Sequence, residues 1–180
     1  QGLRIADIGT GSGCISILLA RELANSRVSA VDISKDALGL ARENADLHKI
    51  EIELFQANIL DWRKDKVLGS MEQQFDVIVS NPPYIQRCDT GSMSKNVLDY
   101  EPEEALFVET DEPLIFYNAI ANWSCQALIP GGSLYLEVNE RFGNNVKNLL
   151  LERGFTDVVL KRDIHDKDRM VRCKWDPVKS

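Results

Sequence analysis

A strand, a glycine loop and a helix follow one another within the first 19 residues, and this order constrains the fold more than any other feature. Residues 3–8 form an apolar strand pattern that contains Asp7, and the loop Gly9-Thr10-Gly11-Ser12-Gly13 follows. Apolar residues at helical spacing then occupy 14–19. Glycines allow a ligand to approach the backbone, and a helix begins with free N–H groups, so such a loop is typical of a binding site. Taken alone, it is equally compatible with a plain tight turn.

Apolar strand patterns alternate with helical patterns along the 180 residues, which contain no internal repeat. We predict strands at 3–8, 27–32, 50–56, 75–80, 132–138, 155–161 and 169–175, and helices at 13–24, 35–48, 112–128 and 141–153, with a weaker one at 63–72. This alternation is typical of an α/β fold with helices on both faces of a parallel sheet. The last two strands lack a helix between them and should form an antiparallel hairpin. We therefore expect one domain, residues 1–180, with a seven-stranded, mostly parallel sheet whose last strand is antiparallel.

The second strand ends in an acid, Asp32, at the place where an acid accepts hydrogen bonds from ribose hydroxyls. Asp32 could instead cap the next helix, although Ser34 is the better candidate for that cap. The dinucleotide fingerprint is not met, because Cys14 occupies its third glycine position. Asp7 is poorly placed beside a pyrophosphate but suits the cationic amino-acid portion of S-adenosyl-L-methionine. We therefore expect that cofactor, with S-adenosyl-L-homocysteine as the product.

The segment Asn81-Pro82-Pro83-Tyr84 follows the apolar strand 75–80, at the edge where open α/β sheets bind ligands. Asn81 offers a side-chain acceptor, and the proline that follows restricts it to extended geometry, so that a backbone carbonyl can lie beside it. Two neighbouring acceptors suit a planar NH2 group, and Tyr84 supplies an aromatic face. The segment predicts a pocket for an amide or amino nitrogen, although such a segment alone is often only a strand-ending turn.

In combination, these motifs resemble the HemK/PrmC family, methyltransferases that modify the side-chain amide of a glutamine in peptide chain release factors. Further similar segments are Tyr100-Glu101-Pro102-Glu103-Glu104-Ala105-Leu106, Leu128-Ile129-Pro130-Gly131-Gly132-Ser133-Leu134, and Asp163-Ile164 with Asp168-Arg169. The resemblance covers nearly the whole chain, and only residues 138–143 depart from the family's pattern. It implies a Rossmann-like class I methyltransferase fold, an enzyme that methylates glutamine N5, and a release factor as the protein partner.

The resemblance also implies roles for individual residues. The expected cofactor-binding positions are Asp7, Gly9, Thr10, Gly11, Ser12, Gly13, Asp32, Ile33, Asn58, Ile59 and Asn81. The expected substrate-binding positions are Asn81, Pro82, Pro83 and Tyr84, of which Asn81, Pro82 and Tyr84 are expected to be catalytic. Asn58 would hydrogen-bond the adenine edge and Ile59 would pack on its face, while Trp62 is expected to pack beneath the loop. No metal is required for this chemistry.

Composition narrows the class of partner. The net charge of −7 disfavours a nucleic-acid substrate, which normally requires a basic face. No apolar run approaches the ~20 residues that span a membrane. The four cysteines are scattered without metal-site spacing, which favours a reduced, cytoplasmic setting, and Cys14 and Cys173 are expected to be buried. His165 lies among three aspartates, where a solvated turn is a better interpretation than a metal site.

Two alternative functions remain open. Adenine also carries a planar conjugated NH2 group, so an adenine-N6 methyltransferase acting on DNA or RNA would use the same motif on an unstacked base. A cofactor-binding scaffold without catalysis is the other alternative.

Three expectations concern organisation. Residues 85–110 lack periodicity, and a loop of that length suggests either a mobile flap over the pocket or a surface excursion. The chain begins at Gln1 directly before a strand, so we expect a fragment that lacks the family's helical N-terminal docking domain. We expect a monomer with no nucleic-acid or membrane partner.

Overall fold

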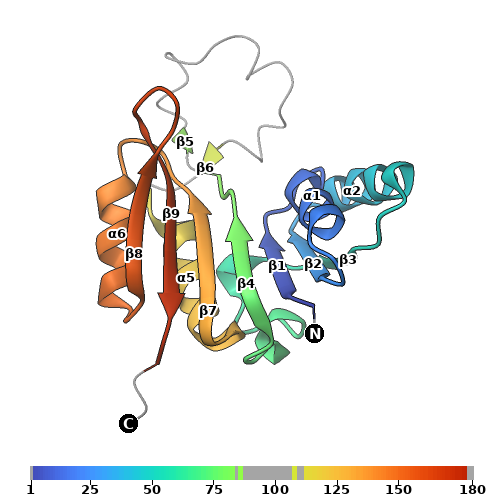
Figure 1. The fold of residues 1–180 in the computed structure, drawn as a ribbon, viewed down its shortest axis with the longest axis horizontal. Helices are drawn as coiled ribbons and strands as arrows, with labels where there is room; N and C mark the ends of the chain where they lie inside the picture. Colours follow the sequence, from blue (N-terminus) through green and yellow to red (C-terminus); the bar gives the residue numbers. More distant parts are fainter. Residues whose placement is uncertain (1, 84, 87–106, 109–111, 178–180) are drawn as a thin grey trace.

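The computed structural model describes residues 2–83, 85–86, 107–108 and 112–177. Seven of its strands form one mixed sheet in the order β3-β2-β1-β4-β7-β9-β8 (Figure 1). These strands are β1 (Arg4–Ile8), β2 (Arg27–Asp32), β3 (Glu53–Gln56), β4 (Phe75–Ser80), β7 (Leu128–Glu137), β8 (Thr156–Arg162) and β9 (Asp168–Trp175). β9 is antiparallel to both neighbours, and the other pairs are parallel. The predicted α/β fold and its terminal hairpin are confirmed.

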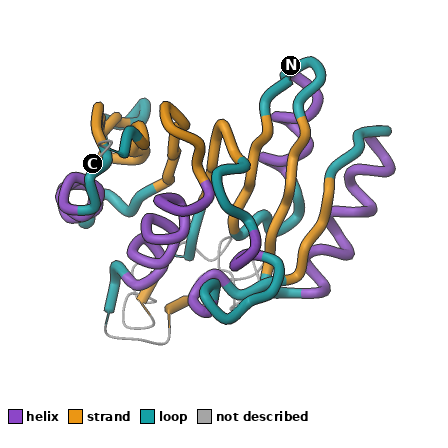
Figure 2. The backbone as a smooth tube through the Cα atoms, turned by 90° about the horizontal axis from the view of Figure 1, so that it is seen from below, coloured by secondary structure: helices purple, strands orange, loops and turns teal. Residues whose placement is uncertain are grey.

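The described helices are α1 (Cys14–Glu22), α2 (Lys35–His48), α5 (Ile115–Ala127) and α6 (Gly143–Glu152). The outermost, α2 and α6, lie at opposite ends of the sheet, beside β3 and β8 (Figures 1 and 2). α2 begins as expected, because the Ser34 side chain accepts a hydrogen bond from the Ala37 N–H. None of the helices in the described part is long and apolar enough to cross a membrane.

The prediction of a helix at 63–72 is wrong. One 3-10 turn, η2 (Leu68–Ser70), lies in this region, and a second, η1 (Ile59–Asp61), ends just before it. The Asp65 carboxylate accepts the N–H groups of Val67 and Leu68, at 2.8 and 2.9 Å, and so favours a local turn over a continuous helix. Trp123 then fastens the turn to α5 by donating its indole N–H to the Leu68 carbonyl.

The strand after α5 begins earlier than expected. β7 starts at Leu128, four residues before the predicted position, and its pairing with β4 shifts register between Phe75 and Val77. Gly131 has a φ of 83°, which accommodates this irregularity.

Large side chains from β4, β7, α5 and the 3-10 turns form the core. Trp123 is fully buried and its ring centroid lies 5.8 Å from that of Phe75. Trp62 is 7% exposed, which confirms that it packs beneath its loop. Cys173 is buried as expected, but the prediction for Cys14 is wrong: it is exposed, because α1 buries its Ser16 and Ile17 side instead.

Only two short pieces of the region 85–110 are described. β5 (Ile85–Gln86) and β6 (Phe107–Val108) pair in parallel as a separate two-stranded sheet. The predicted flap, Tyr84, Cys88 and the segment 100–106 otherwise lie outside the described residues.

Gly13 is required where the glycine loop meets α1. Its φ is 82°, and an added Cβ would lie 3.0 Å from the Ala41 Cβ of α2. We expect Gly13→Ala to lower the free energy of unfolding by about 2 kcal/mol, from backbone strain and crowding. Urea titration followed by circular dichroism measures this change.

Gly39→Ala is the matched control for that substitution. Gly39 lies within α2 with no atom near its potential Cβ. Alanine should therefore stabilise the helix there by about 0.5–1 kcal/mol. Equal losses in both variants would show that the crowding at Gly13 has no effect.

Candidate active site

The register of the sheet brings three predicted site residues to one edge. Ile8 pairs with Val31 on β2 and with Ser80 on β4, so these residues form a row across three strands. Asp32, Gly9 and Asn81 follow this row directly and emerge together at the carboxyl edge.

Direct contacts tie the glycine loop to the strand that carries Asn81. The Ser80 hydroxyl donates to the Ile8 carbonyl at 2.6 Å, in a buried position. A Cβ on Gly9 would come within 4.0 Å of the Asn81 carbonyl oxygen. The glycine loop and the Asn81 segment, 72 residues apart along the chain, therefore border the same space.

Asp7 is sealed beneath the glycine loop. Its Oδ2 accepts hydrogen bonds from the hydroxyls of Thr10 and Ser16, both at 2.7 Å. Its Oδ1 is buried without a hydrogen-bond partner. Desolvation raises the pKa of Asp7 above its ordinary value, against the opposing effect of the two hydroxyl hydrogen bonds. An unpaired carboxylate oxygen below the loop favours a positively charged ligand above it.

Asp32 connects the glycine loop to the start of α2. Its Oδ2 accepts the Gly11 N–H at 2.8 Å, and its Oδ1 accepts the Ser34 N–H at 2.9 Å. Each carboxylate oxygen has two acceptor sites, so both retain capacity for a ligand hydroxyl. Asp32 is only half-buried, so a ligand can reach its carboxylate. The side chain that is predicted to bind ribose therefore also fixes the shape of the glycine loop.

Asn81 is exposed, whereas Pro82 is buried and Pro83 is half-buried. Pro82 anchors the segment in the core, and Asn81 stays exposed where its backbone carbonyl approaches Gly9. Tyr84, the expected aromatic wall, lies outside the described residues.

Comparison with known families identifies this arrangement. Residues 1–102 match the family model described as the methyltransferase small domain. The chain belongs to this family. The matched range contains the glycine loop, Asp32 and Asn81, so all three features of the carboxyl edge lie within the methyltransferase small domain.

Similar proteins extend the likeness beyond this range. The chain is 42% identical over 175 residues to the release factor glutamine methyltransferase of Flavobacterium psychrophilum, covering 97% of this chain and 59% of that protein. It is 43% identical over 176 residues to the protein of the same name from Lactococcus lactis, covering 97% and 62%. The chain thus spans about three-fifths of the length of these relatives. The resemblance predicted from the motifs is confirmed.

Solved structures agree in fold. A methyltransferase from Pyrococcus furiosus superposes with a TM-score of 0.68 at 20% identity, over 97% of this chain and 76% of that one. A SAM-dependent methyltransferase from Aquifex aeolicus gives 0.61 at 15% identity, over 96% and 81%. The expected class I methyltransferase fold is confirmed.

The predicted adenine contacts differ in how accessible they are. Asn58 caps η1, since its Oδ1 accepts the Leu60 N–H and its Nδ2 donates to Asp61. Ile59 is 8% exposed and belongs to the core, which leaves little of its side chain for an adenine face. Ile33, which follows Asp32, is 61% exposed. Ile33 is therefore the better candidate for apolar contact with the cofactor.

Sequence reasoning missed three residues that hold the candidate site in shape. Ser16 binds Asp7, Ser80 fastens β4 to β1, and Asn44 of α2 donates its Nδ2 hydrogen to the Ser12 carbonyl at 2.9 Å. Ser16 and Ser80 lie in apolar runs, and a small hydroxyl residue on the buried side of such a run is the available signal.

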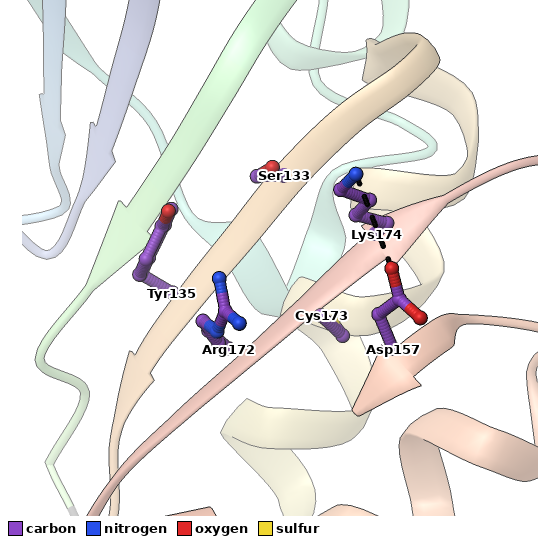
Figure 3. Close-up of a pocket in the computed structure, with 6 residues that line it drawn as sticks. All are labelled: Ser133, Tyr135, Asp157, Arg172, Cys173 and Lys174. Carbon is purple, nitrogen blue, oxygen red and sulfur yellow. Dashed lines mark ion pairs between the residues drawn. The ribbon is translucent and has the colours of Figure 1, made fainter. Parts of the chain in front are cut away.

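A hollow of about 110 Å³ lies elsewhere on the sheet. β7, β8 and β9 line it with Ser133, Tyr135, Asp157, Arg172, Cys173 and Lys174 (Figure 3). Lys174 and Asp157 form an ion pair across it at 3.9 Å. None of the predicted site residues lines this hollow, so it is separate from the carboxyl edge.

Replacing Asp7 by asparagine should stabilise the protein in the absence of cofactor. The pKa of Asp7 is raised from 3.8, so ionisation is penalised in the folded state. The free energy of unfolding of the wild type therefore falls as pH rises from 3.8 to the raised pKa of the folded state. Asp7→Asn has no carboxylate to ionise and does not show this loss. Thermal melts at pH 5 and pH 8 should show a gain of about 2–4 °C at pH 8 and a smaller one at pH 5.

The exposed Asp46 of α2 supplies the control for this prediction. Asp46→Asn should leave the melting temperature nearly unchanged at both pH values. A lower melting temperature for Asp7→Asn at pH 8 would show that the hydrogen bonds from Thr10 and Ser16 outweigh the burial of the charge.

Proposed function

We propose that this chain transfers the methyl group of S-adenosyl-L-methionine to the side-chain amide nitrogen (N5) of a glutamine in a peptide chain release factor. The observation that carries the proposal is the exposed Asn81, whose backbone carbonyl lies next to Gly9 of the glycine loop. The names of the relatives support the choice of substrate, and the likeness in fold supports the choice of cofactor.

The residues present fit the cofactor. A cationic amino-acid portion bound at the loop would favour the ionised form of buried Asp7, whose Oδ1 has no hydrogen-bond partner, and the backbone of residues 9–13 can approach that portion closely. Asp32 retains acceptor capacity for the ribose, and exposed Ile33 offers an apolar face. When bound, the cofactor supplies an electrophilic methyl group on a sulfonium sulfur.

Asn81 and Pro82 orient the nucleophile. A primary amide nitrogen is weakly nucleophilic, because its lone pair is delocalised into the carbonyl. The Asn81 Oδ1 and the Pro82 carbonyl oxygen would accept the two amide N–H groups and so orient the nitrogen, since reacting atoms must lie about 3–3.5 Å apart for transfer. With the cofactor bound, the new N–C bond would form as its S–C bond breaks, and the sulfur would keep the electron pair.

The same acceptors stabilise the transition state. Positive charge develops on the nitrogen during transfer, and acceptor dipoles that are already aimed at it require no reorganisation. The nitrogen becomes acidic once methylated, and its surplus proton then passes to water. The reaction thus needs no dedicated side-chain base.

Label transfer tests the proposal directly. The chain is incubated with methyl-labelled S-adenosyl-L-methionine and, separately, with a release factor, a Gly-Gly-Gln peptide and adenine-containing DNA. Label on the glutamine of the release factor or peptide is the expected result. Label on DNA alone would favour an adenine-N6 methyltransferase. Bound cofactor without any transfer would favour a cofactor-binding scaffold without catalysis.

A further inference from the structure

The turn between β8 and β9 places an apolar side chain fully in solvent. Ile164 is 95% exposed, the highest value among the exposed large hydrophobic residues of the described part. Scattered exposed apolar residues need no explanation in general. Ile164 differs from such scattered residues because its turn is braced by hydrogen bonds and because the turn lies at the same edge of the sheet as Asn81.

Hydrogen bonds to Asp163 brace the turn. The Asp163 Oδ1 accepts the N–H groups of His165 and Lys167, at 2.8 and 3.1 Å, and its Oδ2 accepts the Arg169 Nε–H at 3.2 Å. The Asp163 N–H in turn donates to the Lys167 carbonyl at 2.8 Å. Ile164 is therefore presented on a pre-organised turn, which lowers the entropic cost of binding a partner.

The sheet register places this turn at the same edge as Asn81. Ser80 pairs with Leu136, Leu136 with Val171, and Val171 with Leu160. β7 is parallel to β4, and both β7 and β8 are antiparallel to β9, so β8 runs in the same direction as β4. The carboxyl ends of β4 and β8 therefore lie at the same edge of the sheet. Figure 1 shows the β8–β9 turn rising at this edge.

Strand spacing gives the separation of Asn81 from the turn. Strands lie about 4.8 Å apart, so two to three spacings place the turn about 10–15 Å to the side of β4. Ile164 stands four residues beyond Leu160, whereas Asn81 stands one beyond Ser80, so the turn projects about 10 Å further out. About five residues of extended polypeptide, at about 3.3 Å each, span this distance.

Three basic groups near Ile164 each face a carboxylate. Arg162 lies 3.0 Å from Asp166, Lys167 lies 2.8 Å from Glu140, and Arg169 lies 3.2 Å from Asp163. A nucleic-acid phosphate would require basic groups that are not already facing carboxylates. The turn thus presents an apolar side chain within a neutralised rim, which favours a polypeptide partner.

We propose that Ile164 is a docking contact for the protein substrate, engaging an apolar side chain about five residues away from the methylated glutamine. This inference rests on the proposed function and specifies which part of the substrate the chain binds outside the amide pocket. A tripeptide is too short to reach the turn, whereas a polypeptide that extends about five residues beyond the glutamine is long enough.

The test compares Ile164→Asp with wild type on two substrates, a release factor and a Gly-Gly-Gln peptide. We expect KM for the release factor to rise at least 5-fold with kcat nearly unchanged. Activity on the tripeptide and the Kd for S-adenosyl-L-homocysteine should stay within 2-fold, because Ile164 contacts neither. Ile164→Leu should restore the wild-type KM.

Leu47→Asp is the matched control. Leu47 is 76% exposed near the end of α2, at the opposite edge of the sheet. This variant should leave both substrates unaffected, and thermal melts of both variants check that the fold persists.

Each remaining outcome overturns the inference. An unchanged KM for the release factor, or an equal loss on release factor and tripeptide, shows that Ile164 does not bind distal substrate. A raised KM for DNA alone assigns the turn to nucleic acid. Failure of the wild type to methylate glutamine at all refutes the proposed function, and the docking contact with it.

Discussion

Asn81→Ala is expected to lower the methylation rate by about 10³-fold, the loss typical for removing one preorganised polar group that stabilises transition-state charge. The side-chain oxygen is one of the two proposed acceptors for the substrate amide, and alanine leaves that N–H without a partner. Asn81 is exposed and its strand is fastened through Ser80, so the fold should persist. Single-turnover assays with labelled cofactor measure the rate.

Cofactor affinity separates a role in positioning the amide from damage to the glycine loop. Titration with S-adenosyl-L-homocysteine should give a Kd for Asn81→Ala within a few-fold of wild type. Asn148→Ala, at an exposed position of α6, provides the matched control and should leave the rate and the Kd unchanged. A loss of binding as large as the loss of rate would contradict the proposed role of Asn81.

Asp32→Ala should have the opposite profile, weakening cofactor binding about 10–100-fold while the rate at saturating cofactor stays within a few-fold. Hydrogen bonds to a charged acceptor contribute about 1.5–3 kcal/mol, which corresponds to this range. The variant also frees the Gly11 and Ser34 N–H groups, so part of the loss arises from a loosened loop. Calorimetric titration with S-adenosyl-L-homocysteine measures the Kd.

Asp32→Asn resolves these two contributions. The amide keeps one oxygen acceptor and removes the charge, so an intermediate Kd is expected. Asp46→Ala, an exposed acid on α2, controls for net charge and should bind as the wild type does. An unchanged Kd for Asp32→Ala would remove Asp32 from the proposed cofactor site.

Several features followed from sequence because they depend on short stretches of chain. Glycines at residues 9–13 and prolines after Asn81 restrict the backbone locally, so both motifs could be placed at strand ends before any packing was known. Ser34 caps α2 as expected for the same reason. The helix predicted at 63–72 failed where a local side chain, Asp65, competed for the backbone N–H groups.

Burial depended on segments far apart in the sequence. The predicted cofactor-site residue Ile59 joins a core that also contains Trp123 of α5, and Ile33 is left exposed. Cys14 faces solvent because α1 turns Ser16 toward Asp7. Hydrophobicity and spacing at these positions are equally compatible with either outcome, so only packing distinguishes them.

The sequence by itself determined the order of strands and helices, the class of fold and the two motifs that border the proposed site, because residue type and periodicity govern backbone geometry locally. Only the tertiary structure decided which motifs meet. The row through Ile8 and Ser80 brings Asn81 to the glycine loop, and the pairing of β7 with β9 brings Ile164 to the same edge. Register and burial arise from contacts between distant segments, which no single stretch of sequence specifies.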